Sequence, residues 1–532
     1  MSNNIELTSK NILNTYDEMP YESYPYTQTH PYHLMTLGTL FGMSPVLPET
    51  ARILELGCAG GGNLIPFAVN YPKSTCVGVD LSKVQIDEAN KNVQGLGLKN
   101  ITFHNCSITD VDDSYGKFDY ILCHGVISWV PDFVCAKILE ISQKNLSQNG
   151  ISYISYNTLP GWNMVRTIRE MMLYHSTMFS NIQDKITQSR LLLDFIRDSL
   201  EGSTSPYSEM LRNEASMLAK QHNHYLRHEY LEEENKQYYF NEFMAKAGKF
   251  GLQYLSDVSL STMYLGNMQP KVVEALRAVN DIVRTEQYMD FITNRRFRST
   301  LLCHSSVKLN RTINNEDISK FNMTFSITPE KELSTIDIND PLESLQFFYR
   351  NNKESSISSS SPYMKSILYT FAEHLEPISF EKLTVNASQK LGVNNKLEEI
   401  RKEFITNAMR LVFQGYIAIT LRKAITGKIN LEQPKVAKLA MYQASNSNSL
   451  WVTNLRHEPV GINIFEKYAI RYMNGKNNKE QILESVMLHV VAGEITLNRD
   501  GKKIENHEEI TKELANYLDL FLGNAVTNAL LM

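Results

Sequence analysis

The chain has 532 residues, 42% of them hydrophobic and 21% charged, with a formal net charge of −5 and a pI near 6.3. This length exceeds what one hydrophobic core needs and predicts about three or four structural units, while the lack of a basic excess excludes a global field for binding nucleic acid. Since no apolar run of membrane-spanning length and no secretory or transit pattern occurs, we expect a cytoplasmic protein that does not insert into membranes.

The first 50 residues contain a tyrosine-rich stretch, "TYDEMPYESYPYTQTHPYHL", which begins at Thr15. Its prolines exclude a helix before about Pro31. Two interpretations fit: a surface arm held down by its tyrosines, or a lid (residues 1–50) that folds over a ligand and lines an acceptor channel. We favour the lid, with Tyr16 and His30 against the ligand and Tyr21 in the channel.

Residues 51–165 alternate short apolar runs with longer amphipathic ones, which is typical of a parallel sheet wound with helices. Five strands are expected in chain order, with helices between most of them. The strands are expected at 52–57, 75–80, 101–106, 118–125 and 150–157, and the helices at 62–71, 82–97 and 132–146. The six cysteines contain no C-x-x-C pair and five of them lie on or beside these strands, so we expect neither disulfides nor a metal site.

Beyond the fifth strand the chain turns helical, and residues 166–235 predict a helical insertion. Residues 236–312 predict a helix, a glycine turn and two further strands near 252–255 and 297–309, which bring the sheet to seven strands. The helical stretch between these strands, 268–296, is too long for a hairpin loop. It fits a cap on the sheet and a dimer surface equally well.

The rest of the chain is divided by a serine-rich run, "RNNKESSISSSSPYM" (350–364), which predicts a flexible linker. Helical segments alternate with brief strands beyond it. We expect a middle domain (313–440) and a C-terminal domain (441–532), both mainly helical and winged-helix-like. Because the lysines at 423–438 form only a modest patch, we favour docking of another protein over nucleic acid.

The loop after the first strand, "LELGCAGGGN", carries the most specific chemistry. Gly57, Ala59 and Gly62 fit the glycine fingerprint of dinucleotide sites, which alone does not choose the ligand. Glu55 favours a cationic ligand, because a carboxylate at the end of the first strand repels a diphosphate and attracts a cation. The stretch resembles the first motif of the class I S-adenosylmethionine-dependent methyltransferases, in which E/D-x-G-x-G-x-G wraps the methionine part. Ala59 departs from this pattern, and its effect on the loop stays open.

This resemblance implies further contacts at the carboxyl ends of the next strands, where ligands of open α/β sheets bind. Asp80 is expected to accept both ribose hydroxyls, with capping of the following helix as the alternative. Ser107 occupies the position from which members of this family contact the adenine ring of the cofactor. The main chain around His124 is expected to contact the cofactor, and its imidazole is also a candidate base. The predicted cofactor-binding residues are Tyr16, His30, Glu55, Gly57, Cys58, Ala59, Asn63, Asp80, Leu81, Asn105, Ser107, Ile108, His124, Gly125 and Val126.

Aromatic side chains in the same loops predict the acceptor channel. Trp129 follows the fourth strand, while Tyr156 and Trp162 follow the fifth; packing under a lid is the alternative. An acceptor lysine must arrive neutral, which a dry aromatic channel promotes, and aromatic faces tolerate a methylated ammonium. The predicted catalytic residues are Tyr21, His124, Trp129 and Tyr156.

Three segments, "YDEMPYESYPYTQTHP", "CHGVISWVPD" and "NEFMAKAGKFGLQYLSD", together resemble bacterial methyltransferases with a regulatory domain, and among them the rickettsial protein-lysine methyltransferases of outer membrane protein B. The resemblance runs over essentially the whole chain. It implies a Rossmann-like α/β core, S-adenosylmethionine as cofactor, and a homodimer that methylates lysines of a surface protein by in-line transfer, with the trimethylating type favoured. The alternatives are a small-molecule methyltransferase, a non-catalytic cofactor-binding scaffold and, more distantly, a dinucleotide oxidoreductase.

Overall fold

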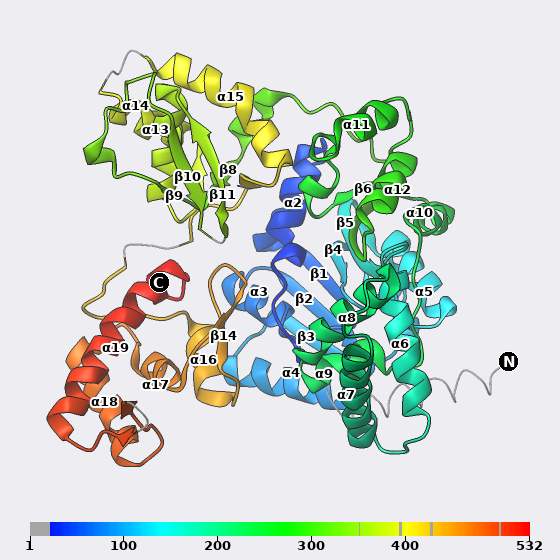
Figure 1. The fold of residues 1–532 in the computed structure, drawn as a ribbon, viewed down its shortest axis with the longest axis horizontal. Helices are drawn as coiled ribbons and strands as arrows, with labels where there is room; N and C mark the ends of the chain where they lie inside the picture. Colours follow the sequence, from blue (N-terminus) through cyan, green and yellow to red (C-terminus); the bar gives the residue numbers. More distant parts are fainter. Residues whose placement is uncertain (1–21, 351, 393–395, 426–428, 500–501) are drawn as a thin grey trace.

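A seven-stranded sheet forms the centre of the molecule, in the order β3-β2-β1-β4-β5-β7-β6 (Figure 1). The computed structural model describes residues 22–350, 352–392, 396–425, 429–499 and 502–532. The first five strands are parallel, and β7 runs antiparallel to both β5 and β6. The strands are β1 (Arg52–Leu56), β2 (Thr75–Asp80), β3 (Ile101–Asn105), β4 (Phe118–Cys123), β5 (Leu146–Asn157), β6 (Leu252–Asp257) and β7 (Phe297–His304).

Helices cover both faces of this sheet, so its central strands are apolar on both sides. Successive residues of β1 show the alternation, because Ile53 faces one core and Leu54 the other. The first core includes side chains of α2 (Pro31–Leu40), α3 (Leu64–Asn70) and α4 (Lys83–Leu96). The second includes side chains of α5 (Asp132–Lys144) and α10 (Phe240–Lys249). The predicted seven-stranded Rossmann-like α/β core is therefore confirmed.

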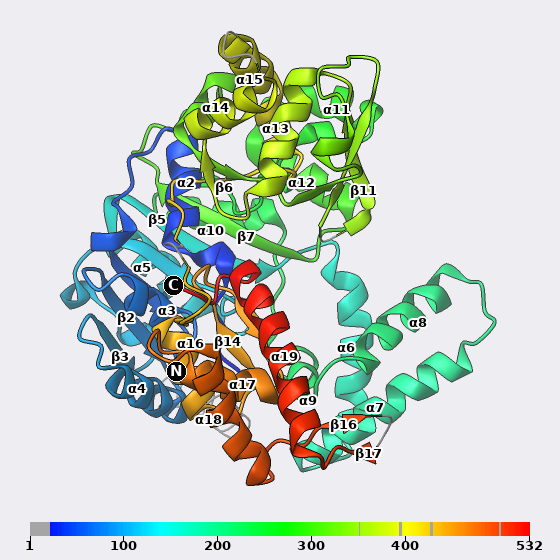
Figure 2. The ribbon, with the colours of Figure 1, turned by 90° about the vertical axis from the view of Figure 1, so that its left-hand side faces the viewer.

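The helical insertion after β5 projects from the sheet as an arm with its own small core (Figure 2). It ends in η5, a π-helical turn that the 3.6-residue period of the sequence does not reveal. The elements are α6 (Trp162–Ser176), α7 (Ile182–Ser199), α8 (Pro206–Ala219), α9 (Asn223–Tyr225) and η5 (Leu226–Tyr230). Two further helices, α11 (Pro270–Arg277) and α12 (Ile282–Thr293), connect β6 to β7.

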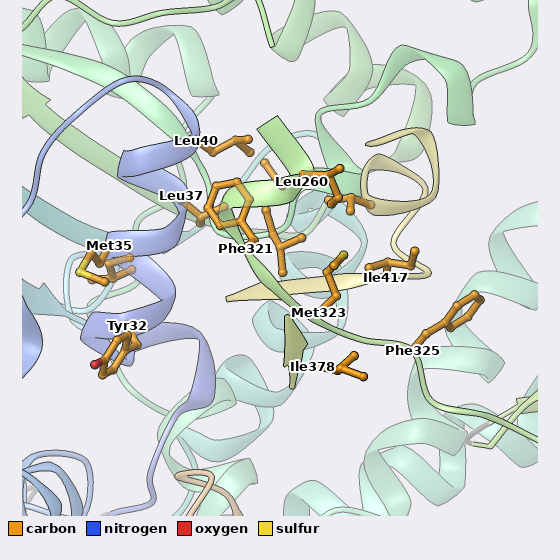
Figure 3. Close-up of a cluster of buried hydrophobic side chains, with 14 of the residues drawn as sticks. Tyr32, Met35, Leu37, Leu40, Leu260, Phe321, Met323, Phe325, Ile378 and Ile417 are labelled. Carbon is orange, nitrogen blue, oxygen red and sulfur yellow. The ribbon is translucent and has the colours of Figure 1, made fainter. Parts of the chain in front are cut away.

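In its described residues, the middle part of the chain contains two three-stranded sheets and three helices, and α2 packs against it (Figure 3). The predicted linker is wrong: Asn352–Ser359 forms β11, an edge strand paired with β10. Its serines suit an exposed edge, since the backbone supplies the pairing. The elements are β8 (Asn322–Thr324), β9 (Ile327–Pro329), β10 (Leu345–Tyr349), β12 (Ile378–Ser379), β13 (Ala418–Thr420), α13 (Pro362–Glu373), α14 (Phe380–Lys390) and α15 (Leu397–Phe413).

The C-terminal part has its own core and lies beside α3 and α4 (Figure 1). The Lys438 ammonium donates to the Leu96 carbonyl at 2.7 Å across this contact. The elements are α16 (Lys438–Asn446), β14 (Trp451–Thr453), β15 (Pro459–Gly461), α17 (Ile464–Tyr472), α18 (Lys479–Val491), β16 (Asn498–Arg499), β17 (Lys502–Lys503) and α19 (His507–Thr527). Within the described ranges, none of the helices has the length and apolar character needed to cross a membrane.

Candidate active site

A cavity of about 390 Å³ opens at the carboxyl ends of β1, β2, β4 and β5. The sheet therefore places it at the edge where open α/β folds bind ligands. The predicted residues that line it are Glu55, Gly57, Cys58, Ala59, Asn63, Asp80, Leu81, Ser107, Ile108, His124, Gly125, Val126 and Trp129. His30, Asn105 and Tyr156 lie elsewhere, and Tyr16 and Tyr21 fall outside the described residues.

The glycine loop leaves β1 through backbone conformations that favour glycine. Gly57 and Gly61 both have φ of +75°, and a Cβ at Gly57 would lie 2.5 Å from Val126 Cγ2. Ala59 also has a left-handed φ, of +45°, which costs an L residue roughly 1–2 kcal/mol. Its amide N–H nevertheless donates to Asp80 Oδ2 at 2.8 Å. The extra methyl group therefore strains the loop slightly without opening it.

Glu55 presents a buried carboxyl to the cavity. Its Oε1 accepts from Asn63 Nδ2 at 2.7 Å, while its Oε2 is buried without a hydrogen-bond partner in the described part of the chain. Burial, and then repulsion from Asp80, raises the pKa of Glu55 to about 8. A buried, half-satisfied carboxyl fits a cationic ligand, because an ammonium supplies both the missing hydrogen bond and the compensating charge.

Asp80 ends β2 and ties the loop to the next helix. Its two oxygens accept the amide N–H groups of Ala59 at 2.8 Å and Ser82 at 2.9 Å. The alternative that Asp80 caps α4 is wrong, because Ser82 is the N-cap and its hydroxyl accepts from the Gln85 amide. Asp80 also lines the cavity, and the two oxygens of a carboxylate can accept a pair of hydroxyls, so it suits a diol as a ligand.

Three residues at the end of β3 or just after it were expected to contact the cofactor; two of them line the cavity and one does not. Ser107 and Ile108 contribute to the wall, together with Thr109. Asn105 is exposed, and its amide donates to the carbonyls of Asp80 at 3.3 Å and Leu81 at 2.8 Å. The predicted cofactor contact of Asn105 is corrected accordingly: its side chain supports the β2–α4 turn from outside the cavity.

Hydrogen bonds and a ring contact fix the position of His124, which follows β4. Its Nδ1 lies 2.8 Å from the Tyr153 hydroxyl and 3.2 Å from the Ser155 hydroxyl, and its ring packs on Tyr26 with centroids 4.1 Å apart. The next amide, of Gly125, donates to Ser155 at 2.8 Å. Burial lowers the pKa of His124 to about 4, so the ring is neutral at physiological pH.

The described start of the N-terminal segment lies over the glycine loop. The Ser23 hydroxyl accepts from the Gly62 amide at 2.7 Å, and the Tyr26 amide donates to Asn63 Oδ1 at 3.0 Å. Residues 22, 23 and 26 line the cavity.

His30, predicted to touch the ligand, does not line the cavity. It caps α2, with Nδ1 accepting from the Tyr32 amide at 3.1 Å. Its buried ring packs against Phe67 and Tyr71. The role of His30 is therefore to start α2, the helix that follows the segment over the loop.

Replacing Gly62 by alanine should displace this segment, because the new Cβ would lie 2.1 Å from the Ser23 carbonyl oxygen. We expect a loss of about 1–3 kcal/mol in the free energy of unfolding, measured by denaturant titration, and faster proteolysis near Ser23. Gly60→Ala is the matched control, since its Cβ would meet the flexible end of Gln85 at 3.0 Å. Equal stability of the two variants would show that the segment is not seated on Gly62.

The prediction that Tyr156 of β5 lines the cavity is wrong. Tyr156 is buried on the opposite face of the sheet, where its hydroxyl lies 3.0 Å from that of Thr300. Side chains alternate along a strand, so the cavity receives Asn157 instead, whose Nδ2 is buried without a partner within the described ranges. Trp162 packs in the arm, with Nε1 donating to Asn235 at 3.1 Å.

The helical insertion contributes a wall of the cavity that the sequence patterns do not predict. His228 and Glu229 of η5 line the cavity, as do Trp129 and Phe297. Burial raises the pKa of Glu229 to about 7, although Arg169 opposes the shift. The π-helical turn breaks the helical period, so periodicity does not mark Glu229 as a cavity residue. The acidic run "EEE" follows just after it, so composition makes Glu229 look like one more solvated charge. A carboxyl next to the expected acceptor channel thus comes from outside the sheet.

Comparisons with known proteins identify three domains in the chain. Sequence models match a methyltransferase domain at residues 48–230, a predicted methyltransferase regulatory domain at 222–304, and the C-terminal winged helix domain of PKMT at 432–530. The last match confirms the winged-helix prediction for the C-terminal domain.

Whole-chain relatives come from Rickettsia. An uncharacterised protein of Rickettsia prowazekii is 63% identical over 98% of this chain and 94% of its own length. The structure of PKMT2 from Rickettsia typhi in complex with AdoHcy matches with a TM-score of 0.89 at 43% identity, over 96% of this chain and 100% of that one. A second PKMT2 structure from Rickettsia typhi matches with a TM-score of 0.87 at 42% identity. The chain therefore belongs to the PKMT family of S-adenosylmethionine-dependent methyltransferases.

Proposed function

We propose that this methyltransferase modifies lysine side chains of a bacterial outer-membrane surface protein, up to trimethyl-lysine. The observation that carries the proposal is the Glu229 carboxyl in the same cavity as Trp129 and Phe297. A carboxyl attracts an amine acceptor, and aromatic faces bind its successively methylated, still cationic products. Methylation of a hydroxyl or thiol gives a neutral ether or thioether, which gains no cation–π attraction from those faces.

The cofactor fits the residues at the other end of the cavity. When bound, S-adenosylmethionine supplies an electrophilic methyl group on a sulfonium. The Oε2 of Glu55, which lacks a partner among the described residues, suits its ammonium, and Asp80 suits its ribose hydroxyls. Gly125 leaves open space beside the loop after β4, since a Cβ there would meet no atom within 4 Å. These residues bind and orient the methyl donor.

Proton removal from the acceptor falls to Glu229 rather than His124. A free lysine ammonium has a pKa of roughly 10.4. His124, with a pKa of about 4, would be a poorer proton acceptor than Glu229, with a pKa of about 7. That difference of about three units corresponds to roughly 4 kcal/mol. His124 therefore serves to position Tyr26 and the loop after β4.

Glu55 should make cofactor binding depend on pH. Its carboxyl holds a proton below about pH 8 in the free protein, and an ammonium in contact with it requires the ionised form. Binding therefore releases a proton, and affinity for S-adenosylhomocysteine should fall as pH falls from 8 to 6, by up to about tenfold per unit. Calorimetry at several pH values measures this. Glu55→Gln should bind weakly with little pH dependence; an equal slope in that variant would assign the proton to another group.

The acceptor class is tested with radiolabelled S-adenosylmethionine. The enzyme is incubated either with unfolded outer-membrane surface protein or with a metabolite pool, and the labelled species are separated by size. Label in the protein supports the proposal. Label in small molecules alone would establish the alternative of a small-molecule methyltransferase, and cofactor binding without any transfer would indicate a scaffold.

We also propose the wider setting of the enzyme, as a cytoplasmic homodimer whose middle and C-terminal domains dock the substrate protein. The domain limits proposed are 1–50, 51–165, 166–235, 236–312, 313–440 and 441–532. The match of residues 432–530 to the C-terminal winged helix domain of PKMT supports a separate C-terminal domain within this setting.

A further inference from the structure

A hairpin of the C-terminal domain reaches the back of the glycine loop. Strands β14 and β15 are joined by residues 454–458, and β14 lies beside α3 (Figure 1). His457, in this turn, is buried and has a left-handed φ of +69°. Its Nε2 lies 2.9 Å from Asn63 Oδ1. Residues almost 400 positions apart thus meet beside the cofactor site.

The hydrogen bonds around Asn63 fix which way its amide points. Tyr26 presents a backbone N–H, which only donates, so the atom it meets at 3.0 Å is the amide oxygen. The amide nitrogen of Asn63 therefore faces Glu55 and donates to Oε1 at 2.7 Å. His457 meets the same oxygen, so it carries its proton on Nε2.

His457 is one of two firm donors in this arrangement. The Thr29 hydroxyl lies 3.1 Å from Asn63 Oδ1, but its single proton is shared with the Tyr26 carbonyl at 2.8 Å. The imidazole stays neutral at physiological pH, because burial and the nearby Arg422 charge lower the pKa of His457 to about 3. Its donor is therefore present throughout the working pH range.

We propose that His457 is a positioning residue through which the C-terminal domain completes the cofactor site, by orienting Asn63 and hence the Glu55 carboxyl that receives the cofactor ammonium. Binding and docking of the hairpin are then coupled, and each strengthens the other. The inference concerns cofactor binding alone and holds whatever the acceptor is.

The competing explanation is packing. The His457 ring lies edge-on to His30, with centroids 5.1 Å apart. If packing were its whole purpose, phenylalanine would replace it fully and glutamine would not. A positioning residue gives the opposite order, since glutamine retains an N–H donor at a similar reach and phenylalanine has none.

The test compares His457→Phe and His457→Gln in the full chain by calorimetry with two ligands. S-adenosylhomocysteine carries the ammonium, and 5′-methylthioadenosine lacks the amino-acid part. We expect His457→Phe to lower the affinity for S-adenosylhomocysteine about tenfold. The affinity of this variant for 5′-methylthioadenosine should stay within about twofold of the natural value. His457→Gln should restore most of the lost affinity for S-adenosylhomocysteine. Gly461→Ala, on exposed β15 with open space around its Cβ, is the matched control and should bind both ligands normally.

Equal weakening of both ligands, or normal S-adenosylhomocysteine binding by His457→Phe, would overturn the proposal. Should that variant fail to fold, hydrogen exchange on the unchanged protein decides. S-adenosylhomocysteine should then slow exchange at residues 454–458 more than saturating 5′-methylthioadenosine does. Equal protection by the two ligands would contradict a coupling through Glu55.

Discussion

Replacing Asp80 by alanine should weaken S-adenosylhomocysteine binding about 100-fold or more, measured by calorimetry. A carboxylate that accepts two ribose hydroxyls makes two charge-assisted hydrogen bonds, each contributing roughly 1.5–3 kcal/mol. The substitution also removes the acceptor for the Ala59 amide, which lies 2.8 Å from Asp80 Oδ2. Both effects lower affinity in the same direction.

Asp80→Asn separates these two contributions. The amide keeps an acceptor oxygen for one partner but loses the charge and the second acceptor. We expect an intermediate affinity and a folded protein, because Ser82 still caps α4. If Asp80→Ala bound the ligand normally, the cavity edge at β2 would not be the ribose site, and the orientation of the cofactor in this account would be reversed or wrong.

Replacing Glu229 by glutamine should lower the rate of methyl transfer about 100-fold while leaving S-adenosylhomocysteine affinity within about twofold. The variant keeps the shape of the side chain but removes the proton acceptor. Because the base must be ionised, the natural enzyme should gain activity as pH rises toward the Glu229 pKa of about 7 and then level off. Glu229→Gln should lack this inflection.

Glu234→Gln is the matched control for Glu229, since it makes the same chemical change on an exposed residue of the same segment. Its rate and pH profile should equal those of the natural enzyme. A normal rate for Glu229→Gln with an unchanged inflection near pH 7 would place the proton acceptor elsewhere and leave the lysine proposal without its main support.

The sheet and the end of the cavity proposed to bind the cofactor were predictable because they depend on local patterns. Alternating apolar runs gave the strands, and a glycine loop between strand and helix gave the position of Glu55. Asp80 followed from its place at the end of the second strand. The parallel sheet brings such strand ends to one edge whatever the detailed packing, so sequence position is enough to place them.

The end of the cavity proposed to receive the acceptor was less predictable, because shifts of one residue and segments distant in the sequence determine which side chains line it. A shift of one residue exchanges the faces of a strand, and it separates buried Tyr156 from cavity-lining Asn157. Glu229 lies on a π-helical turn without a periodic signature. His457 belongs to another domain, and only tertiary structure brings it to Asn63.

The prediction for the serine-rich run was wrong for a different reason. Composition predicted a flexible linker, yet Asn352–Ser359 pairs with Leu345–Tyr349 as an edge strand. Composition reports what side chains prefer, whereas a strand at the edge of a sheet is held by backbone hydrogen bonds and tolerates polar side chains. Ser and Asn content alone therefore did not distinguish a linker from an exposed strand.

The central claim is that this family member methylates lysines in a protein, and tandem mass spectrometry tests it most directly. Unfolded outer-membrane surface protein is incubated with the enzyme and S-adenosylmethionine, then digested and sequenced. The account predicts methyl groups on lysine Nζ atoms, including trimethyl-lysine, and none with the Asp80→Ala variant. Methyl groups confined to other residue types, or a substrate left unmodified while small amines are methylated, would contradict it.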